Sequence, residues 1–169
     1  MEPESEPRAG WSQLVLPDEL LQQLRDMSST ARQQGKLTVH FAGPSGTGKT
    51  MAAKVIAAEL GRPLYRVDLS GVVSKWIGET EKNLDRLIDA AATSGAVLLF
   101  DEADALFASR SEVKDAHDRY ANLETAYLFR KLESYDGLAI IATATPDEPD
   151  EIDDGFMRRF AISVTFPAP

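Results

Sequence analysis

After Gly35 the chain alternates short apolar stretches with longer amphipathic ones, and this alternation restricts the possible folds more than any other feature. The stretches "AVLLFD" at 96–101 and "LAIIATA" at 138–144 are apolar over nearly their whole length, as expected for strands covered on both faces. Similar strands are predicted at 37–43, 63–69 and 161–166. Because helical segments separate these strands, the sequence predicts an α/β fold in three layers, with a five-stranded parallel sheet flanked by helices.

Composition predicts one domain behind a short tail. A chain of 169 residues with 43% hydrophobic content can bury one good core. The start, "MEPESEPRAG", is acidic and proline-rich, so we expect a disordered tail over 1–10 and a single domain over 11–169. Helices are predicted from about Pro17 and over 49–60, 79–94 and 115–135, with a short one at "DDGFMRRF".

Charge and residue usage argue against several classes of protein. A net charge of -9 is unfavourable for binding a nucleic-acid backbone, and the lack of cysteine excludes disulfides and thiolate metal sites. His40 and His117 have no metal-ligand spacing and are interpreted as bystanders. The longest wholly apolar run, 96–100, is too short to span a bilayer, and the first residues lack the pattern of a signal peptide. We therefore expect a cytoplasmic protein with neither nucleic acid nor membrane as a partner.

The segment "GPSGTGKT" at 43–50 fits the phosphate-binding pattern G-x-x-x-x-G-K-[ST], and it follows a predicted strand and opens a predicted helix. Its glycines let the backbone approach phosphate oxygens, and the helix N-terminus adds partial positive charge. Lys49 is expected to reach the β- and γ-phosphates of ATP, and Thr50 to bind Mg²⁺. A glycine-rich turn that matches by chance is the weaker interpretation, because strand, loop and helix occur in the required order. The expected nucleotide-binding residues are Gly43, Pro44, Ser45, Gly46, Thr47, Gly48, Lys49, Thr50, Met51 and Asp101.

A second motif, "AVLLFDEADAL", ends a predicted strand in two carboxylates. Asp101 is expected to hold Mg²⁺ through water, so that Thr50 and Asp101 are the metal-binding candidates. Glu102 can polarise a water for attack on the γ-phosphate. Capping of a helix by acidic residues is the alternative for this motif alone. With the phosphate-binding loop, the two motifs indicate a P-loop NTPase.

Two other P-loop classes fit less well. The letters "DEAD" at 101–104 are those of RNA helicases, with "TAT" at 143–145 in place of their Ser-Ala-Thr. The helicase sequence blocks that should separate these motifs are not visible, and the charge is wrong for RNA. A small-molecule kinase would need an acceptor pocket and an arginine-rich lid, which the sequence does not suggest.

The P-loop, "FDEAD", "SKWIGETEKNL" and "FMRRF" together resemble the AAA+ ATPases, specifically the AAA group of katanin- and spastin-like remodellers. The resemblance covers about Gly10 to Pro167, which makes 11–169 the large ATPase subdomain. "VVSKWIGETEKNL" and "ALFASRSEVKDAHDRYANLE" look most similar to bacterial AAA ATPases encoded beside phage-tail-like contractile injection systems. The family implies a ring, usually a hexamer, that couples ATP hydrolysis to remodelling or threading of polypeptide substrates.

The resemblance also assigns residues beyond the nucleotide motifs. Arg158 and Arg159 match the arginine fingers that act on the ATP site of the next subunit, although two cations near a helix C-terminus could also be idle. Trp76 lies in the position of the pore loop, Lys75, Trp76, Ile77 and Gly78, where an aromatic ring grips an extended chain by packing. A core anchor is the alternative for Trp76. Residues 109–120 match a second pore loop and could equally be a solvated surface.

Some features depart from the family. Relatives end the strand at 138–144 with an Asn that orients the attacking water; this chain has Ala144, and the hydroxyl of Thr145 could take the same role. Relatives carry a longer segment at the position of the stretch between Arg32 and Lys36, and that segment helps to wall the adenine site. The chain stops at "FPAP", where relatives continue into a helical lid. We therefore expect the lid to be absent and hydrolysis of ATP to ADP and phosphate to be weak. The alternative function is a nucleotide-binding module with little or no hydrolysis that acts as an assembly switch.

Overall fold

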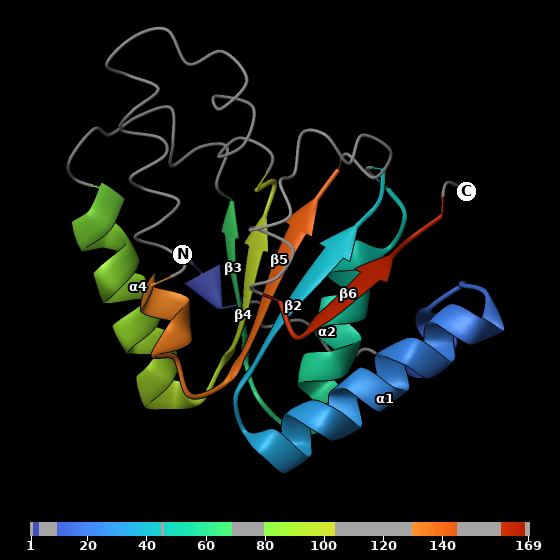
Figure 1. Cartoon of the computed structure of the whole chain (residues 1–169), viewed down its shortest axis with the longest axis horizontal. Helices are drawn as coiled ribbons and strands as arrows, with labels where there is room; N and C mark the ends of the chain where they lie inside the picture. Colours follow the sequence, from blue (N-terminus) through green and yellow to red (C-terminus); the bar gives the residue numbers. More distant parts are fainter. Residues whose placement is uncertain are drawn as a thin grey trace, which may run out of the picture.

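The protein is described by a computed structural model over residues 2–3, 10–44, 46–68, 80–103, 130–144 and 160–167. Within these ranges a central sheet carries helices on both faces (Figure 1). None of the helices seen there is long and apolar enough to cross a membrane. The helices are η1 (Trp11–Gln13), α1 (Asp18–Gln34), α2 (Lys49–Leu60) and α4 (Thr80–Ser94), with a further helical stretch at 130–133. The strands are β1 (Glu2–Pro3), β2 (Leu37–Ala42), β3 (Leu64–Asp68), β4 (Val97–Asp101), β5 (Leu138–Thr143) and β6 (Ile162–Thr165).

The strands lie in the order β1-β3-β4-β5-β2-β6. From β3 to β6 each strand runs parallel to its neighbour, which confirms the predicted five-stranded parallel sheet with flanking helices. β1 is an additional antiparallel strand at the edge beside β3, and it was not predicted from the sequence. It lies inside the segment 1–10 that was expected to be a tail. The boundary between tail and domain at residue 10 stays a prediction.

Two apolar clusters fix the sheet between its helices. On β4, Val97 and Leu99 belong to the cluster covered by α1 and α2, whereas Leu98 and Phe100 belong to the cluster covered by α4 and residues 130–133. All four side chains are fully buried. Burial of each such side chain stabilises the fold by roughly 1.5–3 kcal/mol, so β4 is held from both sides.

α1 ends where its sequence requires and is tied to α2 by polar contacts. Gly35 follows the helix with φ 75°, a left-handed conformation that glycine adopts without strain, and its N–H donates to Ala31 O. The Ser28 hydroxyl donates to Glu59 Oε2 at 2.9 Å, and Arg32 Nη2 donates to Glu59 O at 3.0 Å. These contacts position α1 along α2, the helix that follows the phosphate-binding loop.

The register of the parallel strands brings their carboxyl ends to one edge of the sheet. Ala42, the last residue of β2, pairs with Thr143, the last residue of β5. Asp101, the last residue of β4, pairs with Asp68 of β3. Ligands of parallel α/β sheets bind at this edge, so the register determines which side chains can share a site.

His40, interpreted from the sequence as a bystander, is a buried link between three strands. From β2 its Nε2 is hydrogen-bonded to Thr143 Oγ1 of β5 at 2.9 Å, and its Nδ1 to Ser163 Oγ of β6 at 3.3 Å. Its ring stacks on Phe160, with the centroids 5.2 Å apart. Burial lowers the pKa of His40 from 6.5 to about 4, because the apolar surroundings disfavour the imidazolium.

This lowered pKa predicts that the fold loses stability in mild acid. Between about pH 6.5 and pH 4 the unfolded chain binds a proton at residue 40 that the folded chain does not bind, so the contribution is present above this window and is lost as the pH falls. We expect the free energy of unfolding to fall by about 2 kcal/mol from pH 7 to pH 5, measured by urea denaturation. In His40→Gln most of this pH dependence should disappear, and an identical pH dependence in both proteins would contradict the assignment.

Candidate nucleotide-binding site

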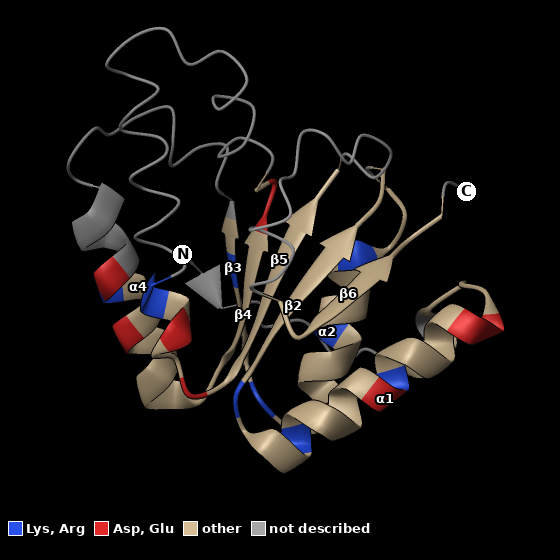
Figure 2. Ribbon diagram, in the orientation of Figure 1, with Lys and Arg blue, Asp and Glu red and all other residues tan. Residues whose placement is uncertain are grey.

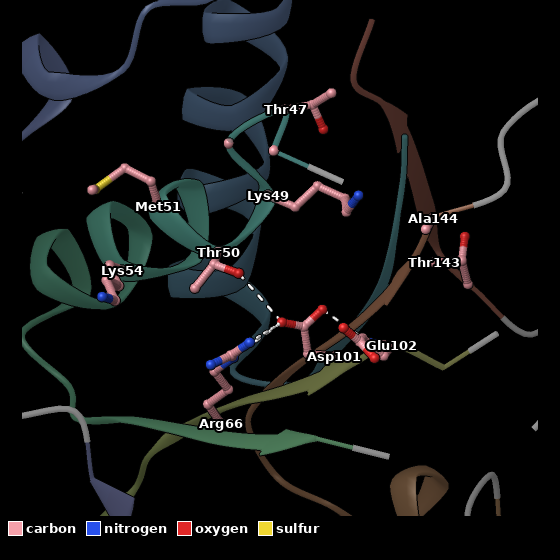
Figure 3. A pocket seen from close by; sticks show the side chains of 12 residues that line it. Thr47, Lys49, Thr50, Met51, Lys54, Arg66, Asp101, Glu102, Thr143 and Ala144 are labelled. Carbon is pink, nitrogen blue, oxygen red and sulfur yellow. Dashed lines mark hydrogen bonds and ion pairs between the residues drawn. The ribbon is translucent and has the colours of Figure 1, made fainter. Parts of the chain in front are cut away.

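The predicted phosphate-binding loop lies between β2 and α2, and its described glycines adopt conformations that few other residues could. Gly46 and Gly48 have φ of 80° and 97°, in the left-handed region. At Gly43 the limit is space, since an added Cβ would lie 2.6 Å from the carbonyl oxygen of Phe166. At these glycines the loop between β2 and α2 therefore carries no side chain (Figure 3).

Lys49 is the first residue of α2, and its charged side chain is buried beside the loop, 8% exposed. Nζ donates to the carbonyl oxygens of Gly43 and, at 3.0 Å, of Pro44. The Thr47 hydroxyl donates to the same Pro44 carbonyl at 2.7 Å. Burying an ammonium group is costly unless it is hydrogen-bonded, and these carbonyls supply that compensation. The ammonium is thereby held beside the carbonyl groups at the start of the loop.

Asp101 ends β4 and is the centre of the polar contacts in the site (Figure 3). Its Oδ1 accepts the backbone N–H of Glu102 at 2.9 Å. Its Oδ2 accepts the Thr50 hydroxyl at 3.4 Å and two N–H groups of Arg66, Nε at 3.0 Å and Nη2 at 2.7 Å. Thr50 and Asp101, predicted from separate motifs, are therefore direct neighbours.

The donor set of Thr50 and Asp101 fits Mg²⁺. Both side chains offer oxygen, and Mg²⁺ is commonly held by one or two protein oxygens while water and phosphate oxygens complete its octahedron. In the part of the chain that the structure describes, no group of three or more His, Cys, Asp or Glu side chains could hold a metal ion. Two protein oxygens are too few for a site made by the protein alone. They suit a metal ion whose other ligands are mainly water and the phosphates of a nucleotide.

Glu102 combines exposure with backbone strain. Its φ is 54°, the one positive value among the described residues other than glycine. The left-handed conformation costs a residue with a Cβ roughly 1–2 kcal/mol. The hydrogen bond from its own N–H to Asp101 Oδ1 helps to hold this geometry. The side chain lines the pocket beside Asp101, where the sequence analysis expected the carboxylate that polarises water.

A pocket of about 440 Å³ connects these elements. It brings together eight of the predicted site residues, which keep their proposed roles as predictions: Gly46, Thr47, Gly48, Lys49, Thr50, Met51, Asp101 and Glu102. Ala144 also lines the pocket, and its side chain is only a methyl group. Gly43 and Pro44 lie at the base of the loop, where they accept the hydrogen bonds of Lys49.

Three further lining residues were missed by sequence reasoning: Lys54, Arg66 and Thr143. Lys54 lies four residues after Thr50 on α2, so helical spacing could have indicated it. Arg66 interrupts an apolar strand, which is a signal, but only the pairing of β3 with β4 reveals its partner. Thr143 was overlooked in favour of Ala144 and Thr145.

The other predicted site residues lie outside the described residues: Ser45, Thr145, Arg158, Arg159 and the loop Lys75, Trp76, Ile77 and Gly78. The same holds for residues 109–120, the expected second pore loop.

A parallel sheet, a glycine loop opening α2 and an acidic end of β4 define the class of P-loop NTPase folds. Within this class the chain belongs to the AAA family, the ATPase family associated with various cellular activities, whose sequence profile matches residues 39–168.

Similar proteins come from bacteria, plants and animals. The uncharacterized AAA family ATPase y4kL of Sinorhizobium fredii is 35% identical over 129 residues, which are 76% of this chain and 38% of that protein. The protein FIGL1 of Arabidopsis thaliana is 33% identical over 85% of this chain and 21% of its own length. Spastin of Xenopus laevis is 33% identical over 72% of this chain and 20% of its own length. The chain thus spans between about a fifth and two fifths of these relatives.

Solved structures show the same fold. The crystal structure of the FIGL-1 AAA domain superposes with a TM-score of 0.77 at 24% identity, covering 99% of this chain and 58% of that one. A structure of the same domain in complex with ADP gives an equal TM-score at 23% identity. At these identities the likeness concerns the fold alone.

The strain at Glu102 predicts an unusual order of stability. Glycine adopts a φ of 54° readily and alanine does not, so Glu102→Gly should be more stable than Glu102→Ala by about 1 kcal/mol in urea unfolding. Both variants lose the carboxylate, so the comparison isolates the backbone. At an ordinary position alanine is the more stable of the two, and that order here would show that Glu102 is unstrained.

Proposed function

We propose that this chain binds ATP with Mg²⁺ and hydrolyses it to ADP and phosphate. The observation that carries the proposal is the single pocket in which Lys49, Thr50, Asp101 and Glu102 meet. Membership of an ATPase family supports the same reaction. A relative's domain in complex with ADP supports binding of an adenine nucleotide.

Each side chain then has a separate task. Lys49 binds the β- and γ-phosphates, and the backbone N–H groups of residues 46–48 surround them. Thr50 and Asp101 hold Mg²⁺, which would neutralise charge on the phosphates. Glu102 lies at the exposed side of the pocket and polarises the attacking water. Met51, 37% exposed at the start of α2, contacts the nucleotide beside the loop.

We propose further that the chain acts within a ring, as the family resemblance implies. Arg158 and Arg159 would reach the ATP site of the neighbouring subunit and stabilise charge on the γ-phosphate. The loop Lys75, Trp76, Ile77 and Gly78 would face the central channel and grip an extended polypeptide, so that hydrolysis drives remodelling or threading of protein substrates. The resemblance to katanin- and spastin-like remodellers supports a protein substrate.

Two further stretches of the sequence suggest the biological system in which this ATPase acts. "VVSKWIGETEKNL" and "ALFASRSEVKDAHDRYANLE" support an association with phage-tail-like contractile injection systems in the cytoplasm. The net charge of -9 favours protein over nucleic acid as the substrate.

One observation favours the alternative of a nucleotide-binding module with little hydrolysis. Ala144 lines the pocket with a methyl group, which cannot orient a water molecule. Thr143 lines it too, but its hydroxyl is already hydrogen-bonded to His40. The rate of ATP turnover decides between the two functions, and the weak activity expected for this chain makes the alternative a real competitor.

Substitutions at Lys49 and Glu102 should separate binding from hydrolysis. Glu102→Gln keeps the loop and its lysine, so nucleotide affinity should be retained while turnover falls by about a hundred-fold or more. Lys49→Ala removes the phosphate-binding ammonium and should weaken nucleotide affinity itself. Titration with a fluorescent ATP analogue and measurement of phosphate release distinguish these effects. Equal loss of affinity in both variants would contradict the separate tasks.

Loss of the proposed fingers should be repaired by a neighbour. The double variant Arg158→Ala, Arg159→Ala should turn over ATP about a thousand-fold more slowly with unchanged nucleotide affinity, because the fingers act on another subunit's site. Mixed with Lys49→Ala subunits, which keep their fingers, it should regain activity. Specific activity of the unsubstituted chain should also rise with protein concentration. A mixture no more active than its parts would contradict action between subunits.

A further inference from the structure

Arg66 is a charged residue in the apolar strand β3, and the alternation of that strand directs it to the nucleotide pocket. Its neighbour Val67 is buried in the cluster beneath α4. Residue 66 therefore projects from the opposite face, the side of α2, where it lines the pocket with Lys54 and Asp101. Figure 3 shows the guanidinium and Thr50 approaching the same carboxylate from different elements.

The two N–H groups of Arg66 converge on one oxygen. Nη2 and Nε lie 2.7 and 3.0 Å from Asp101 Oδ2, while Oδ1 accepts the N–H of Glu102. Oδ2 is also the oxygen nearest the Thr50 hydroxyl, at 3.4 Å. The edge of Asp101 that faces the proposed metal ligand Thr50 is therefore the edge that Arg66 neutralises.

A guanidinium and a divalent cation at one carboxylate oxygen oppose each other. The side chain of Asp101 is 13% exposed, so water screens the two positive charges only partly. The Arg66 side chain is 39% exposed and long enough to shift, so it would weaken metal binding without preventing it. When a nucleotide arrives without metal, the same guanidinium adds a positive charge beside the phosphates.

We propose that Arg66 is a positioning residue that competes with Mg²⁺ for Asp101 and so reduces the dependence of nucleotide binding on metal. This inference rests on the proposed nucleotide site. The quantity that it concerns is the metal coupling factor, defined as the dissociation constant of ADP in EDTA divided by that in saturating Mg²⁺. Arg66 lowers this factor from both sides, by weakening binding with metal and strengthening binding without it.

The test measures the metal coupling factor with a fluorescent ADP analogue, and no turnover is needed. Arg66→Leu should raise the factor about ten-fold. Arg66→Gln keeps a hydrogen-bond donor for Asp101 but no charge, and it should raise the metal coupling factor similarly. It replaces the leucine variant in the test if circular dichroism shows that Arg66→Leu is unfolded. Arg66→Lys keeps the charge and should stay near the original value.

Arg62→Leu is the matched control, because it removes one arginine charge from an exposed position where Nη1 donates to Gly95 O. It should leave the factor unchanged. An unchanged or reduced factor in folded Arg66→Leu or Arg66→Gln would overturn the inference, since Arg66 would then be neutral towards the metal or would help to hold it. If the unsubstituted chain bound ADP in neither condition, the proposed function would fail first, and this inference with it.

Discussion

The parallel register of β4, β5 and β2 is the constraint on which the rest of the structure depends. Because β2 and β5 end at the paired residues Ala42 and Thr143, the glycine loop begins beside the end of β5. Because β4 pairs with β5 and β3, its last residue, Asp101, lies at the same edge of the sheet. A slip of one residue in β4 would turn Asp101 towards the cluster under α4 and leave Thr50 without its neighbour. The apolar clusters on both faces make such a slip costly, since every side chain of β4 from Val97 to Phe100 is fully buried.

The strands and the two motifs of the site could be predicted because each is a short continuous stretch of sequence. Uninterrupted apolar strands indicated burial on both faces, and residues 43–50 carry the whole phosphate-binding loop. The pairing of Arg66 with Asp101 could not be predicted, because it depends on which strand lies beside β4, and strand order is not a local property. The hydrogen bond between His40 and Thr143 could not be predicted for the same reason, because the two residues lie on neighbouring strands but far apart in the chain.

Backbone conformation was a second gap. A positive φ can be expected at the glycines of the loop from the sequence alone. It cannot be expected at Glu102, since nothing in "FDEAD" distinguishes a strained glutamate from a relaxed one. Its conformation follows from how β4 ends: Asp101 turns its carboxylate back onto the N–H of the next residue while Oδ2 engages Arg66 and Thr50. The contacts of Asp101 therefore help to hold Glu102 in its strained conformation.

The distribution of charge gives these contacts a common meaning. The chain carries a net charge of -9, and charged residues of both signs lie along α1 and α4 (Figure 2). The pocket differs from this background: its lining contains Lys49, Lys54 and Arg66 against the carboxylates of Asp101 and Glu102. An acidic protein that gathers three cations around one cavity has a site suited to a polyanion. In the proposed function, Asp101 would serve two kinds of cation, the guanidinium of its own chain and a metal that accompanies the ligand. By our proposal, the strength of the ion pair between Arg66 and Asp101 determines how far nucleotide binding depends on the metal, which the P-loop motif by itself does not determine.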